Sequence, residues 1–303
     1  MYKYQAFHLN ITMPFECSQL LEASEASNHF PNVSVSFANV PEQLDSPLYV
    51  GPAFEATNEE FLLKIEGVGR YLIRQGNEII IEPHPDVTEE EIRLFLLGSA
   101  FGALLNQRGY LVLHASAICT PKGAVLFTGH SGAGKSTTVQ AFIEKGYTKL
   151  SDDTVALYYD AESKKTMVIP SFPNTKLWQK SADVLGKDTT GLARIRPNVE
   201  KFNLSTKEHF HNELTELHAI YELTPLSQSD KLSLAALTTI DKFKLLFSHT
   251  YRRRYAENLL CKQNHFQIST QIAQKKMIKK LKRPANKNTL TDLVQLLEAD
   301  FTS

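Results

Sequence analysis

Cysteine is scarce in this sequence, and its scarcity excludes two kinds of protein. The chain has only Cys17, Cys119 and Cys261 in 303 residues, and no two of them form a C-x-x-C pair. A cysteine zinc site or a disulfide framework needs more cysteines at closer spacing. We therefore expect a chain that folds without either feature, in the reducing cytoplasm.

Long apolar runs and a net charge are missing as well. The most apolar stretch, residues 94–105, is shorter than the roughly 20 residues that cross a bilayer. The N-terminus has no basic segment followed by an apolar one, so we expect no signal peptide and no membrane partner. With 33 basic and 33 acidic residues, the formal net charge is zero, which argues against a nucleic-acid-binding chain.

The charges are nevertheless unevenly placed along the chain. Residues 1–60 hold one lysine and eight acids, whereas residues 251–287 hold eleven lysines or arginines and one acid. A basic segment of this kind is either a docking surface for an acidic partner or a solvated helix face. The sequence leaves both interpretations open.

One stretch carries a specific chemical signal. Residues 129–136 read G-x-x-x-x-G-K-S, after an apolar run that predicts a strand and before a segment that predicts a helix ending at Gly146. In this context, backbone N–H groups surround phosphates at a helix N-terminus, the lysine reaches the outer phosphates and the serine binds Mg²⁺. An ordinary glycine-rich turn is the alternative, and the order strand, loop, helix argues against it. The expected nucleotide-binding residues are Gly129, His130, Ser131, Gly132, Ala133, Gly134, Lys135, Ser136 and Thr137.

Two adjacent acids follow this helix. The short apolar approach to Asp152 and Asp153 is similar to the metal-binding strand of nucleotide-binding proteins. Neighbouring residues on an extended chain point to opposite sides, so one carboxylate is expected to hold a metal and the other to face a second substrate. A hairpin turn made of two aspartates is the alternative.

The flanking regions suggest two domains. Residues 1–87 show alternating apolar segments and a hairpin at 75–77, which predicts a β-rich N-terminal region. Thr88 and Glu91 predict a capping box at the start of a buried helix that Gly109 ends. Residues 88–303 are expected to form the nucleotide-binding domain, with a basic helical C-terminal part.

Further elements are expected in this second domain. They are a strand at 110–119, a turn-rich segment at 170–178 that turns helical through 185, helices at 243–260 and 268–277, and a helix at 290–301 capped by Thr289 or Thr291. His114, inside the expected strand, is either a core residue or a functional one. Arg194, Arg196 and Lys201 either complete phosphate binding or are surface charges.

The ordered set of His114, the 129–136 motif and Ser151-Asp152-Asp153 resembles the HPr kinase/phosphorylase superfamily. This resemblance implies an α/β fold whose P-loop core is of the HPr kinase/phosphoenolpyruvate carboxykinase type. Residues 113–117, 171–178 and 282–284 resemble a branch of kinases encoded beside ribosomally made peptides, some of which phosphorylate the C-terminal serine of lasso-peptide precursors. The later acid-containing signature of HPr kinases has no match, which argues against phosphorylase activity and against HPr as substrate.

The resemblance implies an ATP-dependent serine kinase with Mg²⁺ as cofactor. Ser136 and Asp153 would hold the metal, Asp152 would accept the proton of a substrate serine, and His114 and Lys135 would assist catalysis. The expected partner is a serine-bearing precursor peptide or small protein, and a homo-oligomer stays open. The alternatives are an HPr-type kinase acting on a phosphotransferase-system carrier protein and a non-catalytic nucleotide-binding regulatory module.

Overall fold

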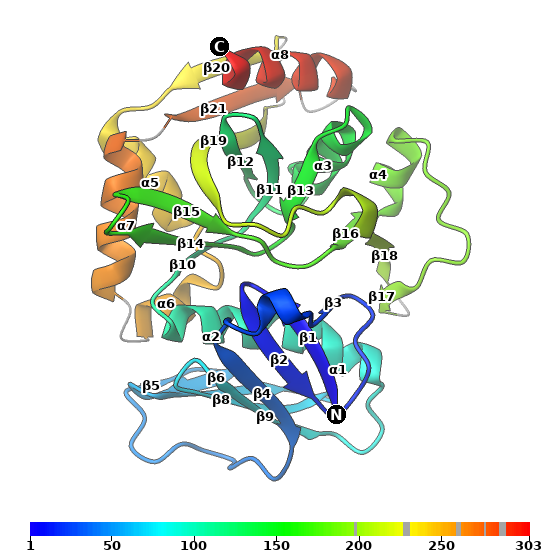
Figure 1. Cartoon of the computed structure of the whole chain (residues 1–303), viewed down its shortest axis with the longest axis vertical. Coiled ribbons are helices and arrows are strands. Elements are labelled where there is room, and N and C mark those ends of the chain that lie inside the picture. The colour runs from blue at the N-terminus through cyan, green and yellow to red at the C-terminus, as the bar shows by residue number, and fades with distance from the viewer. Residues whose placement is uncertain (197–198, 227–230, 259–261, 276, 285–288) are drawn as a thin grey trace.

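The computed structural model describes residues 1–196, 199–226, 231–258, 262–275, 277–284 and 289–303. An N-terminal sheet forms the lower part of the molecule in Figure 1, and a second sheet with helices on both faces forms the upper part. Helix α2 (Phe101–Gln107) lies between the two sheets. None of the described helices has the length and apolarity that a membrane crossing requires.

The N-terminal sheet has nine strands in the order β3-β1-β2-β4-β9-β8-β7-β6-β5. Buried and less buried side chains alternate along β2, as expected for a sheet with one covered face. The predicted hairpin is confirmed, because β8 and β9 pair in antiparallel fashion on either side of residues 75–77. The strands are β1 (Tyr2–Ala6), β2 (Leu9–Met13), β3 (Leu21–Glu22), β4 (Asn32–Phe37), β5 (Tyr49–Val50), β6 (Phe54–Ala56), β7 (Glu60–Ile65), β8 (Gly69–Arg74) and β9 (Glu78–Pro83), with a 3-10 turn at Glu25–Ser27.

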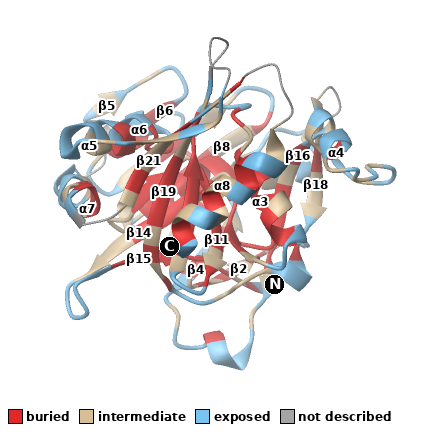
Figure 2. Cartoon of the chain, turned by 90° about the horizontal axis from the view of Figure 1, so that it is seen from above, coloured by how far each residue is buried: buried red, intermediate tan, exposed pale blue. Residues whose placement is uncertain are grey.

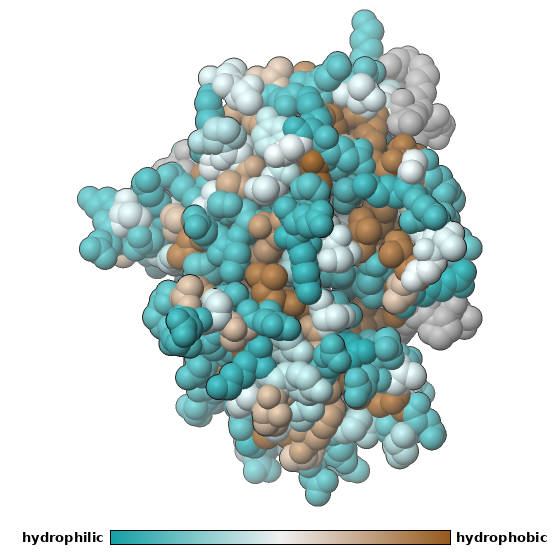
Figure 3. Space-filling model, turned by 45° about the vertical axis from the view of Figure 1, so that its right-hand side comes forward, coloured by the Kyte–Doolittle hydropathy of each residue, from teal (hydrophilic) through white to brown (hydrophobic). Residues whose placement is uncertain are grey.

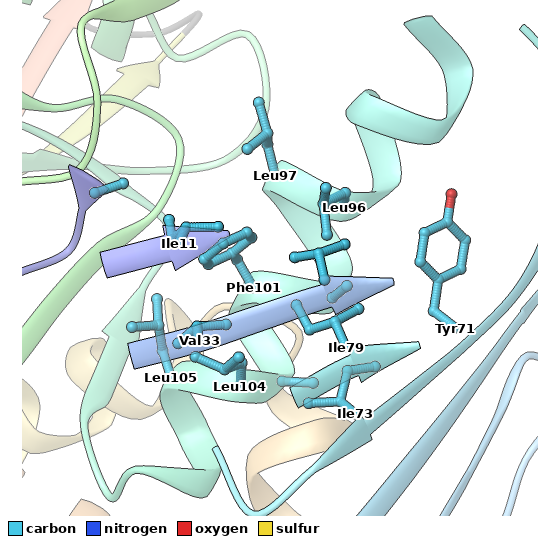
Figure 4. Packing of buried hydrophobic residues seen from close by; sticks show 14 of the residues in the cluster. Ile11, Val33, Tyr71, Ile73, Ile79, Leu96, Leu97, Phe101, Leu104 and Leu105 are labelled. Atoms are coloured by element: carbon cyan, nitrogen blue, oxygen red, sulfur yellow. The ribbon is translucent and has the colours of Figure 1, made fainter. Parts of the chain in front are cut away.

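A buried helical segment covers this sheet. It comprises α1 (Glu89–Phe95), a π-helical turn η2 (Leu96–Ala100) and α2. The predicted capping box is confirmed, since the Glu91 N–H donates to Thr88 Oγ1 at 3.3 Å. Figure 4 shows Phe101 and Leu104 of α2 packed over Val33 and Ile79 of the sheet. The helix therefore closes the core of the N-terminal sheet on the side that faces the second one.

The second sheet runs in the order β10-β14-β15-β19-β12-β11-β13, and β21 and β20 extend it from β19. Strands β12, β19 and β21 are parallel to one another. The strands are β10 (Leu111–Leu113), β11 (Ala115–Thr120), β12 (Gly123–Thr128), β13 (Thr148–Ser151), β14 (Val155–Asp160), β15 (Lys165–Ile169), β19 (Thr215–Leu226), β20 (Ser233–Ala236) and β21 (Met277–Pro284).

Helices cover both faces of this sheet, whose strands Figure 2 shows as a buried layer. Helices α5 (Thr239–Ser248) and α7 (Lys262–Lys275) pack on one face, and α3 (Lys135–Glu144) and α8 (Leu290–Thr302) pack on the other. The ring of Phe142 in α3 stacks on Phe127 of β12 at 5.5 Å and contacts Phe301 of α8 at 5.6 Å. Helix α8 thus holds α3 against the sheet.

A small third sheet stands beside α3, at the right of Figure 1. Its order is β16-β18-β17, and helix α4 follows directly from β16. Its elements are β16 (Asn174–Trp178), α4 (Gln179–Val184), β17 (Arg194–Arg196) and β18 (Val199–Ser205). The described part of the chain also contains the short helices η3 (Lys207–His209) and α6 (Arg253–Asn258).

Several sequence predictions in this domain are wrong in detail. The strand expected at 110–119 is broken at His114, whose N–H donates to the His249 carbonyl at 2.8 Å instead of joining the ladder. Residues 174–178 form β16, because a long-range partner, β18, pairs with them. The helix expected at 243–260 is interrupted at 249–252.

The C-terminal predictions were also only partly correct. The helix expected at 268–277 ends at Lys275, and Met277 already belongs to β21. The basic run at 279–283 is part of this strand, which pairs with β19. Helix α8 is confirmed, but the Thr289 side chain makes no cap hydrogen bond. Cys261 and parts of the basic segment, at 259–261, 276 and 285–287, lie outside the described residues.

Candidate active site at the glycine-rich loop

The glycine-rich loop joins β12 to α3, so the predicted order of strand, loop and helix is confirmed. Gly129 has φ of +143°, and a Cβ there would lie 2.7 Å from the Leu223 carbonyl oxygen of the neighbouring strand β19. Gly134, the N-cap of α3, has φ of +96°. The loop therefore needs glycine, and it brings the chain to the positive end of a helix whose first N–H groups have no intrahelical acceptor.

Lys135 spans the loop. Its Nζ donates to the carbonyls of Gly129 at 2.9 Å and of His130 at 3.2 Å, and the side chain is buried. Burial lowers the pKa of Lys135, and the nearby charges of Asp153 and Asp152 oppose that shift. The ammonium group is thus held over the loop, where it could contact a phosphate bound there.

Asp152 is buried and accepts three hydrogen bonds from three different elements. The donors are Ser116 Oγ of β11 at 2.5 Å, Ser136 Oγ of α3 at 2.9 Å and the Lys176 N–H of β16 at 3.2 Å. The sequence predicted Ser136 and Asp153 as metal ligands, whereas the hydroxyl of Ser136 is hydrogen-bonded to Asp152. A hydroxyl and a carboxylate oxygen side by side at a phosphate loop fit Mg²⁺, which takes one or two protein ligands and completes its shell with phosphate and water. Among the described residues, no cluster of three or more His, Cys, Asp or Glu side chains could hold a metal alone.

Asp153 points elsewhere because the chain turns sharply at this residue. Its φ is +69°, and the Thr154 N–H donates to the Asp152 carbonyl at 2.9 Å across it. This is a γ-turn with a positive φ, a strained conformation that is often found at functional sites. The two carboxylates diverge as predicted, but a turn separates them, whereas the prediction assumed an extended strand.

The carboxylate of Asp153 faces a histidine and a lysine. Its Oδ1 lies 3.3 Å from His114 Nδ1, and its Oδ2 lies 3.8 Å from Lys176 Nζ. Burial alone would raise the pKa of Asp153, but the hydrogen bond with His114 and the charges of Lys176 and Lys201 outweigh it and hold the pKa well below its usual range. Asp153 is therefore ionised at neutral pH, with about a third of its side chain (31%) open to the cleft.

His114 reaches the cleft because of the break between β10 and β11. Thr128 Oγ1 donates to the His114 carbonyl at 3.0 Å, so both backbone groups of this residue are held outside the sheet. The ring can then turn toward Asp153, whose carbonyl lies 3.0 Å from Nδ1. A functional position is therefore favoured over a core position for this histidine.

The cleft above the loop has a volume of about 90 Å³. The face of the molecule in Figure 3, which brings the side with α4 forward, is largely hydrophilic, with apolar surface in patches. Residues from the loop, from the His114–Asp153 side and from β16, α4 and β18 line the cleft: His114, Ser131, Gly132, Gly134, Lys135, Ser136, Thr137, Asp153, Lys176, Leu177, Trp178, Ser181 and Lys201. A larger hollow of about 910 Å³ lies on the N-terminal sheet, where Arg74 and Glu60 form an ion pair. We place the site at the smaller cleft, because the glycine-rich loop and Asp153 line it and the buried Asp152 is hydrogen-bonded to Ser136 of its lining.

Three loop residues predicted to bind nucleotide lie outside the lining of this cleft. Gly129 packs against β19, and His130 has its ring 5.7 Å from that of His249. Ala133 is buried, and its carbonyl accepts from Arg283 at 2.9 Å.

Sequence reasoning missed four residues of the site. They are Ser116, Lys176 and Arg283, which contact the loop or the carboxylates, and Lys149, which is buried behind Asp152. Their spacing carried no signal, since each lies on a separate strand and only long-range packing brings these strands together.

The three cations proposed to complete phosphate binding separate in space. Lys201 lies in the cleft, and the guanidinium of Arg194 lies over the Phe202 ring at 5.8 Å. The side chain of Arg196 lies outside the described residues.

Comparison with known proteins gives a structural likeness but no match in sequence. No family model and no curated protein matches the chain. Among solved structures, it is similar to the Hpr(Ser) kinase/phosphatase from Coxiella burnetii, with 13% identity over 62% of this chain and 89% of that chain and a TM-score of 0.31. A TM-score this low does not establish a shared fold, and the mixed α/β architecture rests on the chain's own sheets and helices.

Proposed function

We propose that the chain is an ATP-dependent serine kinase that acts on a peptide or small protein. One observation carries the proposal: the two adjacent carboxylates have separate partners beside one cleft. Asp152 accepts from Ser136 at the phosphate loop, and Asp153 faces His114 and Lys176. A site that only binds nucleotide needs the first arrangement, whereas phosphotransfer to a hydroxyl also needs the second.

The roles of the two aspartates are therefore the reverse of those inferred from sequence. Backbone N–H groups of the loop and Lys135 would bind the phosphates, and Ser136 with Asp152 would hold Mg²⁺. The metal would neutralise charge on the transferring group. Asp153 would accept the hydrogen bond, and finally the proton, of the attacking serine hydroxyl, with His114 fixing its orientation. Lys176 and Lys201 would offset the negative charge that gathers at this end of the cleft.

The proposed substrate is the C-terminal serine of a lasso-peptide precursor. Support comes from the three segments that resemble the branch of peptide kinases, since each sends a side chain to the loop or to a carboxylate. Residues 113–117 supply His114 and Ser116, residues 171–178 supply Lys176, and residues 282–284 supply Arg283. The alternatives are a phosphotransferase-system carrier protein as substrate, and a regulatory module that binds nucleotide without transfer.

The test is phosphotransfer from ATP to peptides that carry a C-terminal serine, an internal serine or no serine, detected by mass spectrometry. The wild-type protein should phosphorylate the C-terminal serine, and Lys135→Ala should abolish transfer and weaken binding of Mg·ATP. Lys122→Ala, at an exposed turn lysine, is the control and should behave as wild type. Binding of ATP without phosphorylation of any peptide or carrier protein would favour the regulatory module instead.

A further inference from the structure

Trp178 is the only tryptophan of the chain, and it lines the cleft above the loop. Its side chain remains 44% exposed, although large aromatic groups usually bury most of their area in the folded state. Lys201 Nζ lies 5.4 Å from the centre of the ring. An aromatic face that is left open in a cationic cleft calls for a ligand with both an aromatic and an anionic part.

The geometry of β16 fixes which side chains share the cleft. Lys176 and Trp178 are two residues apart on a strand, so they point to the same face. Trp178 is paired with Lys201 of β18, and paired residues also share a face. One face of the small sheet therefore presents two cations and the indole to the phosphate loop.

The two ends of this face, along β16, have different surroundings. At one end, Lys176 Nζ lies 3.8 Å from Asp153, where the acceptor hydroxyl is proposed to sit. Trp178 lies about 7 Å further along the strand, at roughly 3.3 Å per residue. Just beyond it, Ser181 of α4 accepts a hydrogen bond from Thr137 of α3 at 2.9 Å. Trp178 thus lies toward Thr137, the third residue of α3, and away from Asp153.

A nucleotide bound at the loop would lie along the same line, from Asp153 toward Trp178. The lysine of such a loop reaches the outer phosphates, and the backbone N–H groups cradle the inner ones. The outer phosphate belongs near Asp153, so the nucleoside belongs at the other end of the cleft, by Thr137 and Trp178.

We infer that Trp178 is the stacking platform for the base of the bound nucleotide, a role that rests on the proposed nucleotide site. Stacking on an indole face is tolerant of base identity, because every base has a π face. The site should therefore bind ATP and GTP with similar affinity and select the nucleotide chiefly by its phosphates.

Intrinsic fluorescence offers a direct test, since all tryptophan emission comes from Trp178. Mg·ATP and Mg·GTP should both change the emission in a saturable way. Inorganic tripolyphosphate with Mg²⁺ should bind in calorimetry but leave the emission nearly unchanged. Unchanged emission with bound ATP would overturn the stacking inference.

Variants separate this inference from the proposed site. Trp178→Ala should raise the Kd of ATP about tenfold, as expected for a lost base stack, and leave the Kd of tripolyphosphate unchanged. Trp178→Phe, which keeps an aromatic face, should restore most of the affinity. Phe247→Ala, at an exposed ring outside the cleft lining, is the matched control and should change neither value.

Three outcomes would contradict the inference. Equal loss of ATP and tripolyphosphate in Trp178→Ala would mean that the indole supports the loop. An unchanged Kd for ATP with a raised KM for the acceptor peptide would place the indole against the acceptor. If wild-type protein bound neither ATP nor tripolyphosphate, the nucleotide site itself would be wrong; in the first two outcomes it would stand.

Discussion

The two aspartates give the sharpest prediction, because the structure assigns them different surroundings. Asp152→Asn replaces a buried acceptor of three hydrogen bonds by a group that can accept on one atom only. At least one bond to a charged acceptor is lost, and such a bond is worth about 1.5–3 kcal/mol. The free energy of unfolding should fall by about that amount, and Mg·ATP binding should weaken because a neutral amide replaces the carboxylate proposed to hold Mg²⁺.

Asp153→Asn should separate phosphotransfer from nucleotide binding. Asparagine tolerates a positive φ, but the depressed pKa of Asp153 means that the folded state stabilises the charged carboxylate, so the free energy of unfolding should fall. Mg·ATP binding should stay close to wild type, because Ser136 is bonded to Asp152 and not to Asp153. Phosphotransfer should fall by about 10²- to 10⁴-fold, the usual contribution of a positioned general base.

Three measurements on the same preparations decide the matter: denaturant unfolding, calorimetric titration with Mg·ATP, and phosphopeptide yield by mass spectrometry. Asp86→Asn, at an exposed carboxylate outside the cleft lining, controls for the loss of one charge. The reasoning is refuted if Asp153→Asn transfers phosphate at the normal rate. It is also refuted if Asp152→Asn keeps both its stability and its affinity for Mg·ATP.

Three further predictions follow from burial and charge. Burial lowers the pKa of Lys149 to about 7, so above pH 7 the folded state releases a proton that the unfolded chain keeps up to about pH 10. The free energy of unfolding should therefore rise with pH faster in the wild type than in Lys149→Met. The difference in slope should reach about 1.4 kcal/mol per pH unit. Equal slopes would contradict this pKa. Gly129→Ala should abolish Mg·ATP binding, because its Cβ would lie 2.7 Å from the Leu223 carbonyl oxygen. Binding retained in calorimetry would contradict this prediction. Changing the exposed Arg252–Arg254 to Gln should raise the KM for an acidic peptide and flatten its salt dependence; an unchanged KM would leave this basic segment as a solvated face.

Local sequence signals predicted the elements that depend on near neighbours. The capping box at Thr88 and the hairpin at 75–77 rest on contacts within a few residues, and both are confirmed. The strand, loop and helix around 129–136 are likewise set by glycine placement and apolar patterning. Such features need no knowledge of the rest of the chain.

The predictions failed where residues far apart in the sequence determine the local structure. The backbone N–H of His114 binds His249, far along the chain, so an apparently continuous strand breaks. Lys279 and its neighbours look like a solvated charge run, yet this segment pairs with β19, and Lys279 forms an ion pair with Asp300. The orientation of Asp152 depends on donors from three separate elements, which no spacing rule reveals.

The packing of α8 on α3 has a consequence for the order in which the protein can fold during synthesis. Lys145, just past the end of α3, pairs with Glu298 of α8, and 153 residues separate them in the sequence. At about 5–20 residues per second, a ribosome needs roughly 8–30 s to cover that distance. During this interval the apolar face of α3 around Phe142 lacks its final cover, so the growing chain exposes the helix that follows the glycine-rich loop to chaperones and to neighbouring chains.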